Sequence, residues 1–209
     1  MQNAIRKGDY EIAGYAMWEL LPQYTPYLRK RLLVISAEDC FGVITKEILA
    51  LTERGDEESL TKALALLFSA KKNRDADYFV CNLMYSDTPG EWEKGELAKT
   101  LHSAIRKRNM VEAGEYSAEL FKSNRKEFWR MLSETAQVYY PHLEDEFAAL
   151  QKANENMTKP AEETIFVAKA IVLMWTKRTP LEGLLGHPSM NFYGLLSPDD
   201  IVEPKQLDE

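Results

Sequence analysis

Cysteine, glycine and long apolar runs are all scarce in this sequence. The two cysteines among 209 residues, Cys40 and Cys81, make neither a disulfide framework nor a zinc site, and both lie among apolar residues as buried free thiols do. No apolar run approaches the ~20 residues that cross a bilayer, and the N-terminus has no apolar signal core. These absences disfavour a disulfide-stapled secreted domain and predict a cytoplasmic protein without a membrane span.

Positive charge is also in short supply. The sequence has 33 Asp and Glu against 26 Lys and Arg, which leaves a net charge of −7 and disfavours broad nucleic-acid binding, since that depends on neutralising phosphates. Two local basic clusters are nevertheless candidate contacts for nucleic acid or for a partner, namely Lys71, Lys72 and Arg74, and Arg106 with Lys107. The alternative is that lysines near the end of a helix complement its dipole.

The residues that would carry out chemistry are missing. Gly90 and Gly95 have the spacing of a phosphate-binding loop, but Glu96 stands where that loop needs Lys followed by Ser or Thr. The three histidines are scattered and have no partner at a dependable metal-ligand spacing. No histidine lies near Ser36 in sequence to suggest a nucleophile and base. We therefore expect no catalytic, cofactor-binding or metal-binding residues, and no enzyme.

Apolar residues recur with the 3.6-residue period of helices along nearly the whole chain, and no alternating strand pattern is convincing. The predicted fold class is therefore all-α, a multi-helix bundle. The expected helices are Asp9 to Leu21, Thr25 to the Glu38-Asp39 pair, Val43 to Glu53, one from Asp56 or Ser59 to the break at Lys71, Asp75 to Met84, Glu96 to Lys107, Met110 to Phe121, Asn124 to Tyr139, Pro141 to Asn154 and Pro160 to Lys177.

Aromatic and methionine side chains are expected to fill the core of this bundle. Trp18, Trp129 and Trp175 lie within helical patterns, whereas Trp92 follows a turn and is a candidate for contact with a partner. The residues of the first long helix expected to face inward are Ile12, Ala13, Ala16, Met17 and Leu20.

The second half of the chain repeats the first. The matches one hundred residues apart are Ala4-Ile5-Arg6-Lys7 with Ala104-Ile105-Arg106-Lys107, Ala13-Gly14 with Ala113-Gly114, Glu19-Leu20 with Glu119-Leu120, and Leu28, Lys30 and Leu32 with Phe128, Arg130 and Leu132. A slightly larger offset aligns residues 65–72 with 170–177. This ordered series predicts a tandem duplication of a helical unit. The alternative is a set of generic amphipathic helices in register by accident.

The predicted domain organisation follows from the repeat. Residues 1–88 form a first helical unit, and residues 89–178 form a duplicated second unit, stacked on the first through apolar faces. Asp87–Gly90 is a turn by composition. Residues 179–209 hold several prolines and glycines, and they are expected to form an extended tail that packs on the helices through Phe192, Tyr193, Leu195 and Leu196.

Four segments of the first unit carry a family resemblance. They are Ala4-Ile-Arg-Lys-Gly-Asp9, Ala13-Gly-Tyr-Ala-Met-Trp-Glu-Leu20, Leu32-Leu-Val-Ile-Ser-Ala-Glu-Asp39, and the alanine-rich helix from Thr61 to Lys72 with Asn73 after it. Together they resemble the C-terminal, clamp-loader-collar-like domain of the MgsA/RarA replication-associated recombination ATPases. The Glu-Asp helix end is the most specific piece, and the second half has Thr135-Ala-Gln-Val-Tyr139 in its place.

The resemblance implies a fold and a setting, but not ATP hydrolysis. In that family the domain forms an all-helical collar, like the C-terminal domain of the DNA polymerase III clamp loader, and it mediates homotetramer assembly behind an ATPase module. Here Met1 opens almost directly on the collar-like unit, so the ATPase module is expected to be absent. Because a duplicated unit can replace a contact between chains by one within a chain, we expect a monomer or a dimer.

Ser36, Glu38 and Asp39 are the structural signature of this resemblance. Glu38 and Asp39 are expected to cap a neighbouring helix or to pair with a basic residue such as Arg29 or Arg31. The function expected is a non-enzymatic interaction or oligomerisation module, with a protein partner from DNA replication or recombination. The alternatives are self-association, weak DNA binding through the local basic patches, a helical-repeat scaffold unrelated to replication, and an enzyme with an unrecognised site.

Overall fold

The computed structural model describes residues 1–40, 42–85, 95–107 and 109–176. All regular structure in these ranges is helical, which confirms the all-α fold class. The elements are α1 (Gln2–Lys7), α2 (Tyr10–Glu38), α3 (Thr45–Arg54), α4 (Glu57–Ser69), α5 (Asp75–Tyr85), α6 (Glu96–Lys107), α7 (Met110–Ser123), α8 (Arg125–Tyr139), the 3₁₀ turn η1 (Pro141–Leu143), α9 (Glu144–Glu155) and α10 (Pro160–Thr176). The predicted turn at Asp87–Gly90, Trp92, the side chains of Cys81 and Trp175, and the tail 179–209 lie outside what the structure describes.

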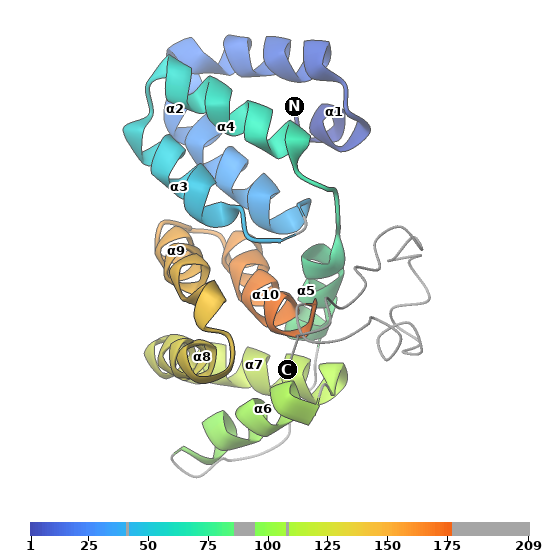
Figure 1. Ribbon diagram of the computed structural model, residues 1–209, viewed down its shortest axis with the longest axis vertical. Coiled ribbons are helices and arrows are strands. Elements are labelled where there is room, and N and C mark those ends of the chain that lie inside the picture. The colour runs from blue at the N-terminus through green and yellow to red at the C-terminus, as the bar shows by residue number, and fades with distance from the viewer. Residues whose placement is uncertain (41, 86–94, 108, 177–209) are drawn as a thin grey trace, which may run out of the picture.

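The helices form three layers. In Figure 1, α1 to α4 make the upper layer, α5, α9 and α10 lie across the middle, and α6 to α8 make the lower layer. The core is continuous from one layer to the next.

Side-chain caps begin several helices where the sequence predicted them. Asp9, Asp56 and Asn124 each accept a hydrogen bond from the backbone N–H three residues later, at 3.0, 2.9 and 3.0 Å. At the other end of α3, Gly55 has a φ of +69°, a left-handed conformation that glycine adopts without strain. These local signals set the lengths of α2, α3, α4 and α8.

The two helices predicted on either side of Thr25 form one kinked helix, α2. The backbone leaves helical geometry at Tyr24, with φ −124° and ψ 26°. Pro22 and Pro26 flank that residue, and a proline inside a helix removes a backbone hydrogen bond and bends the axis. Thr25 does not cap a new helix, because its Oγ1 donates to the carbonyl of Leu21 at 2.5 Å.

The kink gives α2 two halves with different surroundings. The outer half, residues 10–23, follows the upper edge of the molecule in Figure 1, whereas the inner half, residues 25–38, turns into it. The inner half buries the continuous stretch 32–37. Every residue of the outer half is described, and only Ala13 and Met17 are buried. One broad side of the outer half therefore faces solvent.

The predictions that Ile12 and Trp18 lie in the core are wrong. Each residue is 59% exposed, whereas the predictions for Ala13, Met17 and Trp129 are confirmed by their burial. Successive residues of a helix point about 100° apart. Ile12 and Trp18 therefore lie on either side of the narrow stripe that Ala13 and Met17 turn inward.

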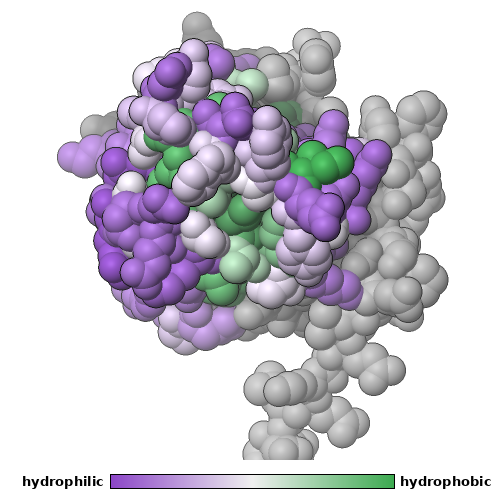
Figure 2. Space-filling view, turned by 90° about the horizontal axis from the view of Figure 1, so that it is seen from above, coloured by the Kyte–Doolittle hydropathy of each residue, from purple (hydrophilic) through white to green (hydrophobic). Residues whose placement is uncertain are grey.

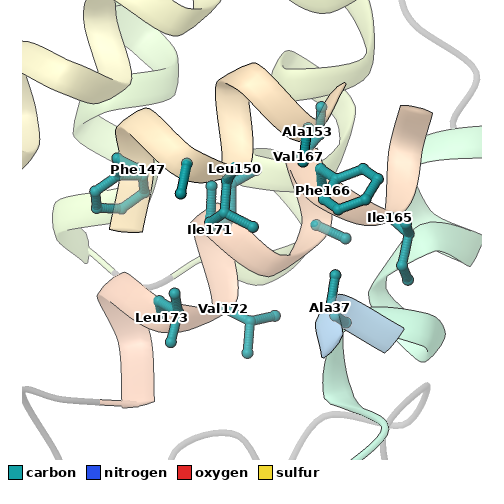
Figure 3. Close-up of a cluster of buried hydrophobic side chains, with 14 of the residues drawn as sticks. Ala37, Phe147, Leu150, Ala153, Ile165, Phe166, Val167, Ile171, Val172 and Leu173 are labelled. Carbon is teal, nitrogen blue, oxygen red and sulfur yellow. The ribbon is translucent and has the colours of Figure 1, made fainter. Parts of the chain in front are cut away.

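The core joins the upper layer to the middle layer along α9 and α10. Figure 3 shows Phe147 and Leu150 of α9 beside the apolar side chains of α10, with Ala37 from the end of α2 close to them. Residues 165–174 of α10 are all buried, and burying a large apolar side chain contributes ~1.5–3 kcal/mol. Even so, no helix in the described ranges has the length and apolar character needed to cross a membrane.

Candidate functional site

A buried lysine lies where the layers meet. Lys169 belongs to the apolar stretch of α10 and is 3% exposed. Its Nζ donates to the backbone carbonyl of Cys40, two residues past the end of α2. Burial lowers the pKa of Lys169, and the charge of Glu146 opposes that shift most strongly. An amine buried in an apolar helix needs a hydrogen-bond acceptor, and the carbonyl of Cys40 is one.

Glu146 is fully buried and ties α9 to the start of α3. Its carboxylate accepts hydrogen bonds from the backbone N–H groups of Ile44, Thr45 and Lys46, at 3.3, 2.9 and 2.8 Å. The first turn of a helix leaves such donors without partners, and no side-chain cap of its own serves α3. Because Glu146 and Lys169 are closed off from solvent, they serve the fold rather than a ligand.

The Glu38–Asp39 helix end forms an ion-pair cluster with α1. Arg6 donates through Nε to Asp39 at 2.5 Å and through Nη2 to Glu38 at 2.8 Å. Gln2 donates to the other oxygen of Asp39 at 2.6 Å. Ser36, the third residue of the predicted signature, is buried and donates to a backbone carbonyl of the preceding turn. The signature residues thus hold α1 against α2.

The predicted basic partners of this pair, Arg29 and Arg31, do not reach it. Arg29 donates to the backbone carbonyl of Glu53 at 3.0 Å. Arg31 has no hydrogen-bond or ion-pair partner among the described residues. With a rise of 1.5 Å per residue, Arg31 lies about 10 Å from Glu38 along the helix axis. Arg6 is brought close by the fold instead, which sequence spacing alone does not indicate.

Burial and, next, the charge of Asp39 raise the pKa of Glu38 above its ordinary 4.5. A raised folded-state pKa means that the stabilisation is present below the unfolded pKa and is lost as the pH rises through the folded one. Glu38→Gln removes this titration. We therefore expect the free energy of unfolding of the variant, relative to that of the wild type, to be higher at pH 7 than at pH 4. Urea unfolding at both pH values measures the difference, and an equal difference at both would contradict the raised pKa.

The basic residues predicted to contact nucleic acid or a partner are dispersed. Lys72 is half-buried, its Nζ donates to three backbone carbonyls around the end of α4, and burial lowers its pKa. Arg74 pairs with Asp77. Lys71 is exposed beside them. This cluster adjoins the end of α4, whereas the other predicted cluster lies on α6 in the lower layer, so the fold does not combine them (Figure 1).

In the basic cluster on α6, Arg106 contacts an aromatic ring instead of a carboxylate. Arg106 lies over the ring of Tyr139, 5.3 Å from its centroid, and Lys107 is exposed at the end of the helix. His102 lies beside Tyr139 in an open hollow of about 430 Å³ between α6 and α8, and burial, with the charge of Arg106, lowers its pKa. Within the described ranges, no three His, Cys, Asp or Glu side chains are placed to hold a metal ion.

Exposed aromatic side chains gather on α2. Among the described residues, nine large apolar or aromatic side chains are at least a third exposed, and six of them belong to this helix. We call these six the α2 aromatic face: Tyr10, Ile12, Tyr15, Trp18, Tyr24 and Tyr27, between 55% and 68% exposed. Figure 2 looks down on this end of the molecule, where pale and green atoms lie at the centre beside a broad purple area.

The sequence interpretation missed this face because it assigned the aromatic residues to the core. One signal was available, since residues 10–28 contain no Lys or Arg and only two charged residues, Glu11 and Glu19. A helix on the surface of a soluble protein usually carries many more charges on its outer side.

Comparison with known proteins identifies no relative of this chain. No protein-family model matches the chain, and neither a curated protein nor a solved structure matches it. The function is therefore argued from the surface and the contacts of this chain.

Proposed function

We propose that this chain is a non-enzymatic helical module that binds another protein through the α2 aromatic face. The observation that carries the proposal is the exposure of six large side chains on one helix. Groups of large exposed apolar and aromatic side chains often mark contact sites, because soluble monomers otherwise keep such surface small. Tyr and Trp are also the residues that concentrate binding energy at protein interfaces.

The α2 aromatic face is well suited to binding because its side chains stand on a fixed backbone. Tyr15 and Trp18 lie in the middle of the outer half, where helical hydrogen bonds hold the backbone. Tyr10 stacks on Phe68 of α4 with 4.2 Å between ring centroids, which orients one edge of the face. Rigid aromatic side chains lose little conformational entropy on contact, so more of the buried area contributes to affinity.

The proposal includes a tandem duplication, which matched environments one hundred residues apart support. Asp9 and Asn109 both cap a helix, and their backbone N–H groups donate to the carbonyls of Ala4 and Ala104 at 2.8 and 3.0 Å. Buried at both members of each pair are Ile5 and Ile105, Ala13 and Ala113, Leu28 and Phe128, and Leu32 and Leu132. Two copies of one unit explain this agreement better than chance.

The Glu38–Asp39 cluster also has a counterpart in the second half. Arg106 stands at the position of Arg6, and Tyr139 at the position of Asp39. Arg106 lies over the Tyr139 ring, so a cation–π contact takes the place of the ion pair. A diverged copy that kept the contact while changing its chemistry accounts for both arrangements.

A setting in DNA replication or recombination remains part of the proposal through the resemblance of residues 4–39 and 61–73 to MgsA/RarA collar domains. In that family the collar is a protein-contact domain, which agrees with an interaction face on α2. Direct DNA binding is less well supported, because Lys72 and Arg74 are engaged within the chain.

Loss of the tryptophan tests the proposal. The full chain is tagged and used as bait in an extract of its source cells, where it is expected to retain a partner protein. The Trp18→Asp variant is expected to bind that partner about 30-fold more weakly. This factor corresponds to the ~2 kcal/mol of binding free energy typical of an interface hot spot. The retained protein is then purified and titrated against both chains. Light scattering of the bait alone shows whether that partner is a second copy.

Val138→Asp is the matched control, because Val138 is 69% exposed on α8, away from the α2 aromatic face. It is expected to bind as the wild type does. Equal binding by the wild type and Trp18→Asp would reject the α2 aromatic face, and a monomer that retains no protein would reject the interaction module.

A further inference from the structure

A groove lies beside the kink of α2. A hollow of about 610 Å³ is lined by Tyr15 and Leu20 of the outer half, by Tyr27 and Arg31 of the inner half, and by the first residues of the chain. A second hollow of about 280 Å³ is lined by Tyr27, Arg31 and Lys30 together with the start of α10. The two hollows adjoin each other at Tyr27 and Arg31, and we call them together the kink groove.

The kink groove contains positive charge that the chain does not neutralise. Lys30 and Arg31 are half-buried, and neither has a hydrogen-bond or ion-pair partner among the described residues. The groove also contains Glu19 and Glu162, of which Glu162 faces Lys159 at 3.9 Å. Arg31 lines both hollows and Lys30 lines the smaller one, so the smaller hollow offers two cations with no carboxylate bound to them.

Apolar and aromatic side chains line the same two hollows. Tyr15, Leu20 and Tyr27 line the kink groove, and Tyr15 and Tyr27 also belong to the α2 aromatic face. The groove is thus continuous with the face proposed to bind a protein. Cations beside tyrosine rings and an aliphatic side chain complement a ligand that presents carboxylates next to apolar side chains.

We propose that the kink groove binds a segment of a partner protein in which Asp or Glu lies next to Leu, Ile, Phe or Tyr, with the carboxylates on Lys30 and Arg31. This inference rests on the proposed function, because it names the partner chemistry of the surface that includes the α2 aromatic face. Half-buried charges interact with an incoming carboxylate more strongly than fully exposed ones, since water screens them less.

A protein segment fits the kink groove better than nucleic acid does. Nucleic-acid grooves carry excess positive charge along their length to neutralise successive phosphates. Here Glu19 and Glu162 interrupt the positive charge, and the whole chain carries a net charge of −7. One or two carboxylates flanked by apolar groups match two cations; a phosphate backbone does not.

Selection from a random twelve-residue peptide display library, with the full chain as bait, tests the inference. The selected peptides are expected to be enriched in Asp and Glu next to apolar residues. A fluorescent synthetic peptide of the selected sequence is then titrated by anisotropy. Lys30→Glu/Arg31→Glu is expected to weaken binding at least tenfold, and raising the salt concentration is expected to weaken binding to the wild type.

Lys122→Glu/Lys126→Glu, an equal charge reversal at exposed positions on α7 and α8, is the matched control and should bind as the wild type does. Circular dichroism confirms that each variant is folded. The inference is overturned if no peptide is selected, if acidic residues are not enriched, or if the Lys30/Arg31 variant binds equally well. Displacement of the peptide by oligo(dT) at equal concentration would assign the groove to nucleic acid instead.

The two proposals fail in different ways. If the selected peptides lack acidic residues, and their binding is lost in Trp18→Asp but not in Lys30→Glu/Arg31→Glu, the α2 aromatic face is supported and the acidic partner is rejected. Acidic peptides that depend on Lys30 and Arg31 but not on Trp18 would keep the groove and reject the aromatic face as the interface.

Discussion

Alanine in place of Glu146 is expected to lower the free energy of unfolding by about 4 kcal/mol, because each buried N–H group left without an acceptor costs about 1–3 kcal/mol. The backbone N–H groups at the start of α3 lose their acceptor, and Lys169 keeps its amine in an apolar stretch without the main opposing charge. Urea unfolding followed by circular dichroism measures the loss.

The neighbouring residue gives the control. Asp145 is exposed and bonds only the side chain of Lys46, so Asp145→Ala is expected to change stability little. Adding Lys169→Met to Glu146→Ala should recover part of the loss, because an apolar side chain then replaces a buried amine that has lost its nearby negative charge. Equal stability of the Glu146→Ala and Asp145→Ala proteins would contradict the role given to Glu146.

Asp39→Ala is expected to cost about 3 kcal/mol, because it removes the buried partner of Arg6 and Gln2. The loss should be smaller than for Glu146, since Arg6 is partly exposed and can regain water. The same urea titration measures it. Asp77→Ala, which breaks a more exposed ion pair with Arg74, serves as a milder comparison.

A double-mutant cycle separates the ion pair from other effects of the Asp39 substitution. Arg6→Ala and Asp39→Ala should each destabilise, and the double variant should lose at least ~1 kcal/mol less than their sum. Strict additivity would mean that the contact between Arg6 and Asp39 contributes nothing to stability.

Features decided within a few residues were predictable from the sequence. The caps at Asp9, Asp56 and Asn124 depend on a side-chain oxygen and a backbone N–H three residues away, so the pattern itself contains the interaction. The period of apolar residues likewise predicted the helices from α3 to α10, but not the short helix α1. The merging of two helices across Tyr24 was missed, because Thr25 looks like a cap until its hydroxyl is seen bonded to the preceding turn.

Features decided by packing between distant residues were not predictable from one sequence. Trp18 fits a helical core pattern, and its exposure follows from how little of the outer half of α2 is covered. Arg6 lies more than thirty residues from Glu38, and Glu146 lies about one hundred from the helix that it caps. The same holds for the kink groove, because Pro22 and Pro26 indicate a break in the helix but not which distant residues line the hollows beside it.

The contacts of Lys169 and Glu146 bear on how the molecule moves. The end of α2, the start of α3, α9 and α10 all meet at these two side chains, so opening either half would break bonds that the other half shares. Opening of the two halves is therefore coupled. The outer half of α2, which buries only Ala13 and Met17, takes part in none of these bonds. Another molecule can therefore bind to it without disturbing the contacts that join the halves.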